Sequence, residues 1–331
     1  MSYPTETPAP STKINAIQII RAIAIIAVVI IHTTPSGIGQ VICRPFLNFA
    51  VATFLFLSGY LTKTENDNWK AFYKKRITRV IIPYIIWSIL CSLPAVYKKG
   101  IEVLIINLIT ANASAVMYYI FVYIQFVLLT PLLGRLAKSK YRTLGWFVAP
   151  VSLLIFKYYF LLTGTELSTS TQIIWGNSCL GWFTFYYLGL LLGNKIIEVN
   201  YRLGTLSFLY VISLFLQIAE GYGWFLLGDT NCGTQMKLTT LVTSTIFLLI
   251  VHSFLREKKD YQNRFLRLTG DYSFGIYLSH LAILVVLQHT NGYSLLPYPV
   301  NSLVVLLISL GCCYIGDKVL GRRISNWLGL R

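Results

Sequence analysis

The sequence predicts an all-α integral membrane protein, a single bundle of about ten transmembrane helices. Of its 331 residues, 55% are hydrophobic and 12% are charged, whereas soluble domains carry about 25% charged residues. The mean hydropathy is +0.63, and apolar stretches of about 20 residues, enough to cross a bilayer, recur along the chain. These values exclude a soluble enzyme, a disulfide-rich secreted domain and a disordered chain.

A polar N-terminal segment, residues 1–13, precedes the first apolar stretch. That stretch is too long for the apolar region of a signal peptide, so we expect a short cytoplasmic tail and a retained first span. The ten expected spans cover residues 14–33, 45–62, 78–97, 116–135, 143–162, 177–194, 203–220, 236–255, 272–290 and 297–317. The amphipathic segment 101–109 is expected at the interface. Because the polar connections are short, residues 14–331 are expected to form one membrane domain.

Lysine and arginine outnumber aspartate and glutamate by 28 to 12. In a soluble protein this excess would suggest nucleic-acid binding, but the cytoplasmic loops of membrane proteins also collect Lys and Arg. With a cytoplasmic N-terminus, 22 of these 28 residues fall in cytoplasmic segments, and four (Arg44, Lys98, Lys99 and Lys237) fall on the other side. The bias predicts that both termini are cytoplasmic and gives no reason to expect a nucleic-acid partner.

The first span carries two residues that are costly in lipid, Arg21 and His32. Eleven residues, about three helical turns, separate them, so they share one helix face and lie about 16 Å apart along the axis. Such a face can line a cavity that crosses much of the bilayer. The alternative is an interfacial His32 and an Arg21 that extends its side chain to the interface, although Arg21 lies some two turns inside the span.

A second group of polar residues surrounds the connection between the second and third spans. Ser58 and Gly59 form a small-residue step, which also suits close helix packing. The basic cluster that follows contains Arg76 and Arg79, whose three-residue spacing places them on one helix face. Two guanidinium groups at the membrane boundary can clamp the phosphates of a cytoplasmic ligand. The rest of the cluster is expected to fix the topology or to contact anionic membrane lipids.

The ninth span repeats polar residues at helical spacing, with Ser273, Tyr277 and His280 separated by four and three positions. This face is too polar for lipid contact, although His280 alone is equally well explained as a packed core residue. Lys157 is a further charged residue within a span and has no evident partner. The sequence contains no phosphate-binding loop, dinucleotide-binding glycine pattern or metal-ligand spacing, so we expect no metal and no permanently bound cofactor.

Four of these segments together resemble the membrane-bound acyltransferase-3 family, in particular its stand-alone O-acetyltransferases, which modify bacterial surface polysaccharides such as O-antigen. The matching residues are Arg21 and His32 of an Arg–ten residues–His pattern, the run FLFLSGY at 54–60, the set Arg76, Arg79, Pro83 and Tyr84, and the late set Ser273, Tyr277, Leu278 and His280. Their order and spacing cover almost the whole chain.

The resemblance implies acyl transfer from acetyl-CoA, as donor substrate, to a hydroxyl of a cell-surface polysaccharide, its lipid-linked precursor or a related glycan, at the bacterial cytoplasmic (inner) membrane. In this scheme His32 is the general base or acyl carrier, and Arg21 orients the thioester or stabilises its oxyanion. Donor contacts are expected from Arg76, Arg79, Ser58 and Tyr60. Acceptor contacts are expected from Tyr118, Tyr119, Ser273, Tyr277 and His280.

The chain departs from the family pattern at one position. Many members have a His-x-Trp-Tyr/Phe pattern at the start of the fourth span, where this chain has Val116 followed by Tyr118 and Tyr119. If that histidine helps to bind donor or acceptor in relatives, this protein does so differently.

Two other functions remain open at this point. A transporter or flippase for a lipid-linked sugar or small polar solute would also need polar cavity residues, but the sequence lacks an internal repeat and mid-span carboxylates. A non-catalytic scaffold or sensor would need neither Arg21 nor His32. The sequence carries no signal for an oligomeric state.

Overall fold

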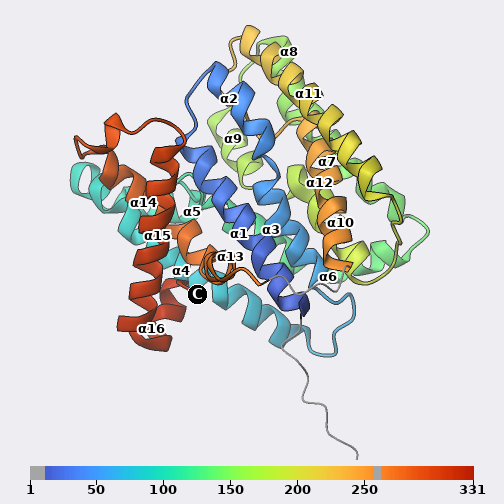
Figure 1. Ribbon diagram of the computed structural model, residues 1–331, viewed down its shortest axis with the longest axis horizontal. Helices are drawn as coiled ribbons and strands as arrows, with labels where there is room; N and C mark the ends of the chain where they lie inside the picture. Colours follow the sequence, from blue (N-terminus) through green and yellow to red (C-terminus); the bar gives the residue numbers. More distant parts are fainter. Residues whose placement is uncertain (1–11, 257–261) are drawn as a thin grey trace, which may run out of the picture.

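The computed structural model describes residues 12–256 and 262–331 (Figure 1). Every regular element in these residues is helical, which confirms the predicted all-α class. Of the expected tail 1–13, residues 1–11 lie outside the described residues. Helix α1 already begins at Thr12.

The α-helices are α1 (Thr12–Thr33), α2 (Ile38–Cys43), α3 (Phe49–Tyr60), α4 (Trp69–Lys99), α5 (Glu102–Thr110), α6 (Tyr118–Lys138), α7 (Gly145–Leu153), α8 (Tyr159–Thr163), α9 (Thr169–Gly176), α10 (Phe183–Gly193), α11 (Leu203–Leu226), α12 (Leu238–Arg256), α13 (Arg264–Asp271), α14 (Ser273–Gln288), α15 (Val300–Val319) and α16 (Gly321–Leu328). Short 3-10 turns cover Arg44–Phe46, Arg142–Leu144, Leu180–Trp182 and Tyr293–Leu295, and a π-helical segment, Leu154–Tyr158, joins α7 to α8.

Within the described ranges, eight helical stretches are long and apolar enough to cross a membrane. They are α1, the run from α2 to α3, α4, α6, the run from Arg142 to Thr163, α11, α12 and α15. Helices α13 and α14 meet at 77° and make a ninth crossing if they are taken as one bent span. The chain is therefore a multi-pass membrane protein, and eight or nine of the about ten expected spans meet these criteria of length and composition in the described residues.

The expected span at 177–194 accounts for most of this difference, because its helix, α10, has only 11 residues and is almost entirely buried. It packs closely along α3 through glycines. A Cβ added at Gly59 would lie 2.2 Å from the backbone oxygen of Tyr186, and one at Gly189 would lie 2.1 Å from that of Phe56. Helix α10 is apolar because protein surrounds it, and hydropathy does not distinguish such a helix from a lipid-facing span.

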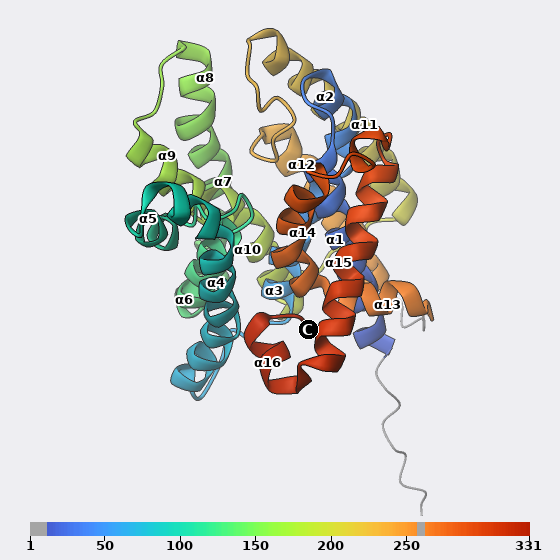
Figure 2. The same ribbon diagram turned by 90° about the vertical axis from the view of Figure 1, so that its left-hand side faces the viewer.

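Helix α1 runs through the middle of the bundle (Figure 1). It packs against α3 and α12 on one side and against α13, α14 and α15 on the other, while α4 and α6 lie further away (Figure 2). Its alanines at positions 16, 22, 24 and 27 are buried, and small side chains let neighbouring helices approach. Helix α1 therefore joins α3 and α12 on one side of the bundle to α13, α14 and α15 on the other.

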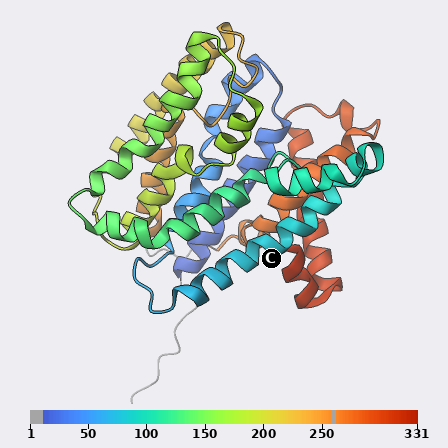
Figure 3. The same ribbon diagram turned by 180° about the vertical axis from the view of Figure 1, so that it is seen from behind.

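Helix α4 has 31 residues and is about 46 Å long, so it exceeds the hydrocarbon core of a bilayer, about 30 Å. The Asn68 side chain caps it by accepting a hydrogen bond from the Ala71 amide at 2.9 Å. The helix continues through two prolines and crosses the face seen in Figure 3. The basic cluster before the expected span 78–97 thus forms the first turns of the same helix. These turns, together with α13 and α16, define what we call the basic end of the bundle.

Lys157 has a partner, contrary to the expectation from sequence. Its Nζ lies 2.9 Å from the Asp229 carboxylate and 5.1 Å from the centre of the Trp224 ring. Asp229 belongs to the connection between α11 and α12, residues 227–237, which the linear sequence places 72 residues away. At the end of this connection the buried Lys237 donates a hydrogen bond to the Cys232 backbone oxygen at 2.9 Å. The Lys157–Asp229 pair holds the connection against the bundle, and the Lys237 hydrogen bond fixes the fold of the connection itself.

Candidate functional site

Three cavities adjoin one another along α1. The His32 cavity, about 290 Å³, is lined by His32, Asn48, Tyr118, Trp182, Gln235 and Tyr277 among others. The Arg21 cavity, about 150 Å³, is lined by Arg21, Phe54, Arg79, Tyr119, Ser273 and Tyr277 among others. The basic cavity, about 620 Å³, is lined by Arg21, Ser58, Lys75, Arg76 and Arg79 among others. Neighbouring cavities share wall residues. The His32 and Arg21 cavities share Tyr277, and the Arg21 and basic cavities share Arg21 and Arg79. The three cavities therefore follow one another from the C-terminus of α1 toward the basic end.

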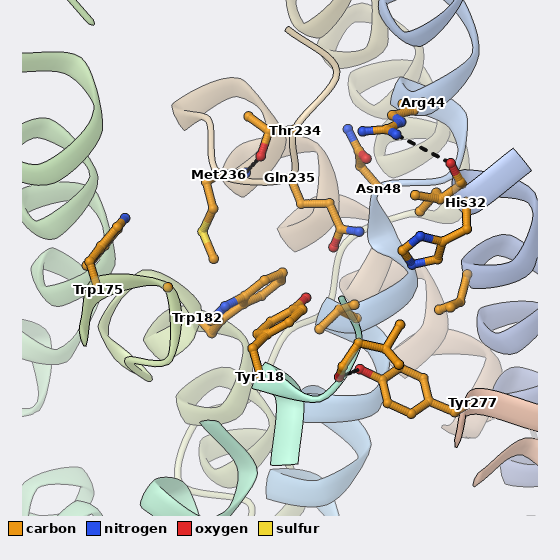
Figure 4. Close-up of a pocket in the computed structure, with 15 residues that line it drawn as sticks. His32, Arg44, Asn48, Tyr118, Trp175, Trp182, Thr234, Gln235, Met236 and Tyr277 are labelled. Carbon is orange, nitrogen blue, oxygen red and sulfur yellow. Dashed lines mark hydrogen bonds between the residues drawn. The ribbon is translucent and has the colours of Figure 1, made fainter. Parts of the chain in front are cut away.

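The His32 cavity is built from several distant segments. His32 lies at the end of α1, and Asn48 is the residue that precedes α3. Tyr118 begins α6, Trp182 lies in the turn before α10, and Gln235 lies in the connection between α11 and α12. Figure 4 shows their side chains gathered around one space. The aromatic rings and amide groups provide both stacking surfaces and hydrogen-bonding groups.

A second histidine lies beside His32. The ring centres of His32 and His280 are 5.3 Å apart. The Nδ1 atom of His280 lies 2.9 Å from the Ile276 backbone oxygen and 2.8 Å from that of Tyr277, so Nδ1 carries a hydrogen and, in the neutral ring, Nε2 holds a lone pair. Nε2 is buried and has no hydrogen-bond partner among the described residues. The pair therefore contains an unused proton acceptor.

Two tyrosines separate the His32 cavity from the Arg21 cavity. The Tyr277 hydroxyl donates a hydrogen bond to the Val116 backbone oxygen, and the Tyr277 ring lies 5.4 Å from that of Tyr119. Val116 and Tyr277 both line the His32 cavity, while Tyr119 and Tyr277 both line the Arg21 cavity. Tyr277 thus forms part of the wall between the two spaces.

The Arg21 cavity receives one guanidinium group from α1 and one from α4, those of Arg21 and Arg79. Ser273 lines the same space and is 1% exposed. Its Oγ has no hydrogen-bond partner in the part of the chain that the structure describes. Because a buried polar group without a partner is costly, the cavity suits a ligand that supplies one.

The basic cavity has four cationic side chains in its wall, those of Arg21, Lys75, Arg76 and Arg79, and none of its described lining residues is acidic. Ser58 also lines this cavity, and its Oγ is buried and lacks a hydrogen-bond partner within the described ranges. Uncompensated positive charge in a concave site attracts anions, and Arg side chains bind phosphate bidentately. The cavity is therefore suited to a polyanionic ligand.

Most of the residues expected at a site from the sequence line one of these cavities. Arg21 and His32 lie on the same side of α1, but they line different cavities rather than one. Tyr60 lines none of the three, because its ring stacks on Phe56 at 5.6 Å and contacts His252 at 5.8 Å. His280 lines none of them either and lies against His32.

Several residues of the His32 cavity were not expected from the sequence. Arg44 and Asn48 lie within the second span, Ile38–Tyr60, and Asn48 is 1% exposed. An asparagine between apolar stretches was a usable signal, since polar residues at membrane depth often mark a site. Trp182 and Gln235 lie in connections whose positions depend on tertiary packing, and no pattern in the sequence marks them.

The described residues contain no group of three or more His, Cys, Asp or Glu side chains arranged to hold a metal ion. The described residues that line these cavities carry imidazole, guanidinium, hydroxyl and amide groups.

The model of the acyltransferase-3 family, described as an acyltransferase domain, matches residues 14–317. No curated protein and no solved structure matches the chain. The family match extends over most of the chain and includes the residues of all three cavities that are discussed above. The chain belongs to the acyltransferase-3 family of membrane acyltransferases.

Proposed function

We propose that this protein is an O-acyltransferase that moves an acyl group, in the first instance acetyl, from cytoplasmic acyl-CoA to a hydroxyl of a cell-surface polysaccharide, its lipid-linked precursor or a related glycan. The single observation that carries this proposal is the series of three cavities along α1. Cations gather at one end of the series, and a histidine pair stands at the other. The family match supports acyl transfer and does not favour a transporter.

The donor is proposed to enter from the basic end, which the charge bias of the loops predicts to be cytoplasmic. Arg76 and Arg79 would hold phosphates of acyl-CoA in the basic cavity. The unpaired hydroxyls of Ser58 and Ser273 would bind polar groups of the chain that carries the thioester. The thioester would then lie in the Arg21 cavity, where the Arg21 guanidinium stabilises negative charge on its oxygen.

In the reaction proposed at the thioester, a single histidine, His32, accepts one proton and later returns it. His32 takes the proton from the acceptor hydroxyl while the oxygen forms a bond to the thioester carbonyl carbon. The electron pair of the carbonyl moves to its oxygen and then returns, the carbon–sulfur bond breaks, and the departing thiolate takes the proton from His32. The alternative order makes His32 itself the acyl carrier before the hydroxyl attacks. Tyr277 must move in either order, since its ring lies between the two cavities.

Residues 14–331 would act as one membrane domain in the bacterial cytoplasmic membrane, with both termini in the cytoplasm. Acyl-CoA would be a substrate rather than a resident cofactor. The acceptor glycan would reach the His32 cavity from the opposite side, where Tyr118 and Trp182 offer ring faces for stacking.

The test of the catalytic assignment is His32→Ala in detergent-purified protein. Acetyl-CoA consumption with a crude glycan or glycolipid extract should fall at least about 10²-fold, the lower end for loss of acid–base catalysis, and mass spectrometry should detect the acetylated product of the wild type. His289→Ala is the matched control, because His289 is exposed and lies outside the three cavities. Near wild-type turnover by a monodisperse His32→Ala variant would contradict the assignment.

The test of the donor site is separate. Arg79→Ala should raise the Michaelis constant for acetyl-CoA about tenfold, the loss expected for one charge-assisted hydrogen bond, and should leave the acceptor dependence nearly unchanged. Lys70→Ala removes a charge from the same helix outside the cavities and should have little effect. If Arg79→Ala and Lys70→Ala have the same Michaelis constant for acetyl-CoA, the basic cluster serves only to fix the topology.

A further inference from the structure

The charged residue of the His32 cavity that the proposed mechanism does not use is Arg44. It lies in the turn between α2 and α3 and lines the cavity together with His32. Its Nη2 donates one long hydrogen bond, 3.4 Å, to the backbone oxygen of Ile31, and its Nε is buried without a partner among the residues described. A guanidinium group has five N–H donors, so most of its bonding capacity is unused.

Arg44 also lacks a neutralising charge. It forms no ion pair with any acidic residue that the structure describes, and none of the described residues lining the cavity is acidic. The two acidic residues of α11 and its following connection are engaged elsewhere. Glu220 accepts hydrogen bonds from Tyr158 and from the Thr239 amide, and Asp229 pairs with Lys157. Because an unpaired and partly buried cation is costly, the cavity is electrostatically incomplete as it stands.

The rest of the wall presents unpaired polar atoms as well. Asn48 is 1% exposed; its Nδ2 donates to the Gly233 backbone oxygen at 3.3 Å, but its Oδ1 has no partner in the described ranges. Trp182 Nε1 and Gln235 Oε1 are buried and equally unpaired there. The residues that line this space of about 290 Å³ thus include two with an unpaired acceptor, one with an unpaired donor and one cation, and the volume lies near the lower end for small-molecule sites.

The wall is also preorganised by neighbouring contacts. The connection that supplies Gln235 is held by Lys157 with Asp229 at one side and by Lys237 with the Cys232 backbone at the other. Gly233 packs so tightly on Arg44 that an added Cβ would lie 2.7 Å from the arginine Cδ. The guanidinium is thus positioned by the chain before any ligand arrives (Figure 4).

We propose that Arg44 binds an anionic substituent, a carboxylate or a phosphate, of the acceptor, so that the acceptor is an acidic saccharide rather than a neutral one. The inference rests on the proposed function, since it takes the His32 cavity as the acceptor site. The Asn48 and Gln235 oxygens accept hydrogen bonds from sugar hydroxyls, and Trp182 Nε1 donates one. Arg44 bonds to Ile31, the residue before His32, so the anionic group and the reacting hydroxyl belong to the same or an adjacent sugar unit.

A bound anion would also assist the chemistry at His32. A cation in the same cavity opposes uptake of a proton by the imidazole, because like charges repel strongly where water is scarce. An anionic substituent on Arg44 offsets that charge. The acceptor would thereby help to activate its own hydroxyl.

The experiment measures binding of three pyranose probes to the purified wild-type protein, independently of turnover. The probes are D-glucuronic acid, α-D-glucose 1-phosphate and methyl α-D-glucoside. At least one anionic probe should bind about tenfold or more tightly than the neutral one, the effect of one charge-assisted hydrogen bond. The carboxylate and phosphate arms distinguish the two sources of negative charge. Equal affinities for all three probes, or no binding of either anionic probe, would overturn the proposal.

Variants locate the anion. Arg44→Gln should abolish the preference for the anionic probe, and Arg44→Lys should keep part of it, because an ammonium group retains the charge but loses the planar fork. Lys99→Gln makes the same charge change on an exposed residue and should leave the preference intact. Loss of the preference in Arg79→Gln but not in Arg44→Gln would place the anion in the basic cavity and overturn the proposal. If Arg44→Gln does not fold, the proposal is tested by the probe affinities of the wild type and of Arg44→Lys. Anion binding without any acyl transfer would refute the proposed function while leaving this site in place.

Discussion

The contact between α3 and α10 gives the most quantitative prediction, because it depends on backbone positions. An ideal Cβ at Gly189 would lie 2.1 Å from the Phe56 backbone oxygen and 2.9 Å from the Tyr60 backbone nitrogen. Carbon–oxygen contacts are normally no shorter than about 3.3 Å, so Gly189→Ala requires the helices to separate by roughly 1 Å. No rotamer change relieves the clash, since the opposing atoms belong to the backbone.

The expected cost follows from overpacking. Forcing an extra methyl group into a packed interface costs about 1–3 kcal/mol and occasionally more, which corresponds to a fall in melting temperature of roughly 1.5–4 °C for a chain of 331 residues. Helix α3 also carries Phe54 and Ser58, which line the Arg21 and basic cavities. Turnover should therefore fall together with stability.

The assay heats detergent-purified protein and measures the fraction that stays monodisperse by size-exclusion chromatography. Gly311→Ala is the matched control, because Gly311 lies inside α15 and a Cβ there would meet nothing within 4 Å. Its melting temperature should be unchanged or higher, since alanine favours a helix over glycine by up to about 1 kcal/mol. Wild-type stability of Gly189→Ala, or an equal loss in Gly311→Ala, would refute the close α3–α10 contact.

Three further predictions address topology, the α11–α12 connection and the wall between cavities. Reporter fusions after Lys140 and after Arg267 should read cytoplasmic and one after Thr165 external; a cytoplasmic signal at Thr165 would reverse the orientation. Burial lowers the pKa of Lys237 from 10.5 to about 8, so the folded state binds fewer protons between these values and gains stability as the pH rises through them. Thermal unfolding should therefore show that the free energy of unfolding of the wild type, relative to that of Lys237→Met, increases by up to about 3 kcal/mol between pH 8 and about 10.5. A difference that stays constant with pH would contradict this. Tyr277→Phe loses the hydrogen bond that holds its ring, so hydrolysis of acetyl-CoA without acceptor should rise; a wild-type hydrolysis rate would mean that other groups keep water from the thioester.

The bundle was largely predictable because lipid imposes a simple rule on sequence. A helix that faces hydrocarbon must be apolar over about 20 residues, and this rule located α1, α4, α6, α11, α12 and α15. It failed at α10, where burial by protein gives the same composition over 11 residues. It also missed the 77° bend between α13 and α14, because no proline marks that break and packing decides it.

The site was predictable only where its residues share one helix. The spacing of Arg21 and His32 places both on the cavity side of α1, as expected from helical geometry. The partition between their cavities comes from Tyr277, some 250 positions later in the chain, and the acceptor-side wall comes from the connection 227–237. Such contacts depend on long-range packing, and the pairing of Lys157 with Asp229 escaped the sequence analysis for the same reason.

These contacts show what surrounds Val116, the residue that stands where the family pattern has a histidine. The Val116 side chain lines the His32 cavity, and its backbone oxygen holds the Tyr277 hydroxyl. A histidine here would place an imidazole in the same space as His32. The second imidazole near His32 is on α14, one turn from Tyr277, where His280 is fixed by two backbone oxygens and leaves its Nε2 unpaired among the described groups. An apolar Val116 leaves the hydrogen-bonding groups of the cavity concentrated at His32, Asn48 and Arg44, the side where an anionic substituent and a reacting hydroxyl would have to bind together.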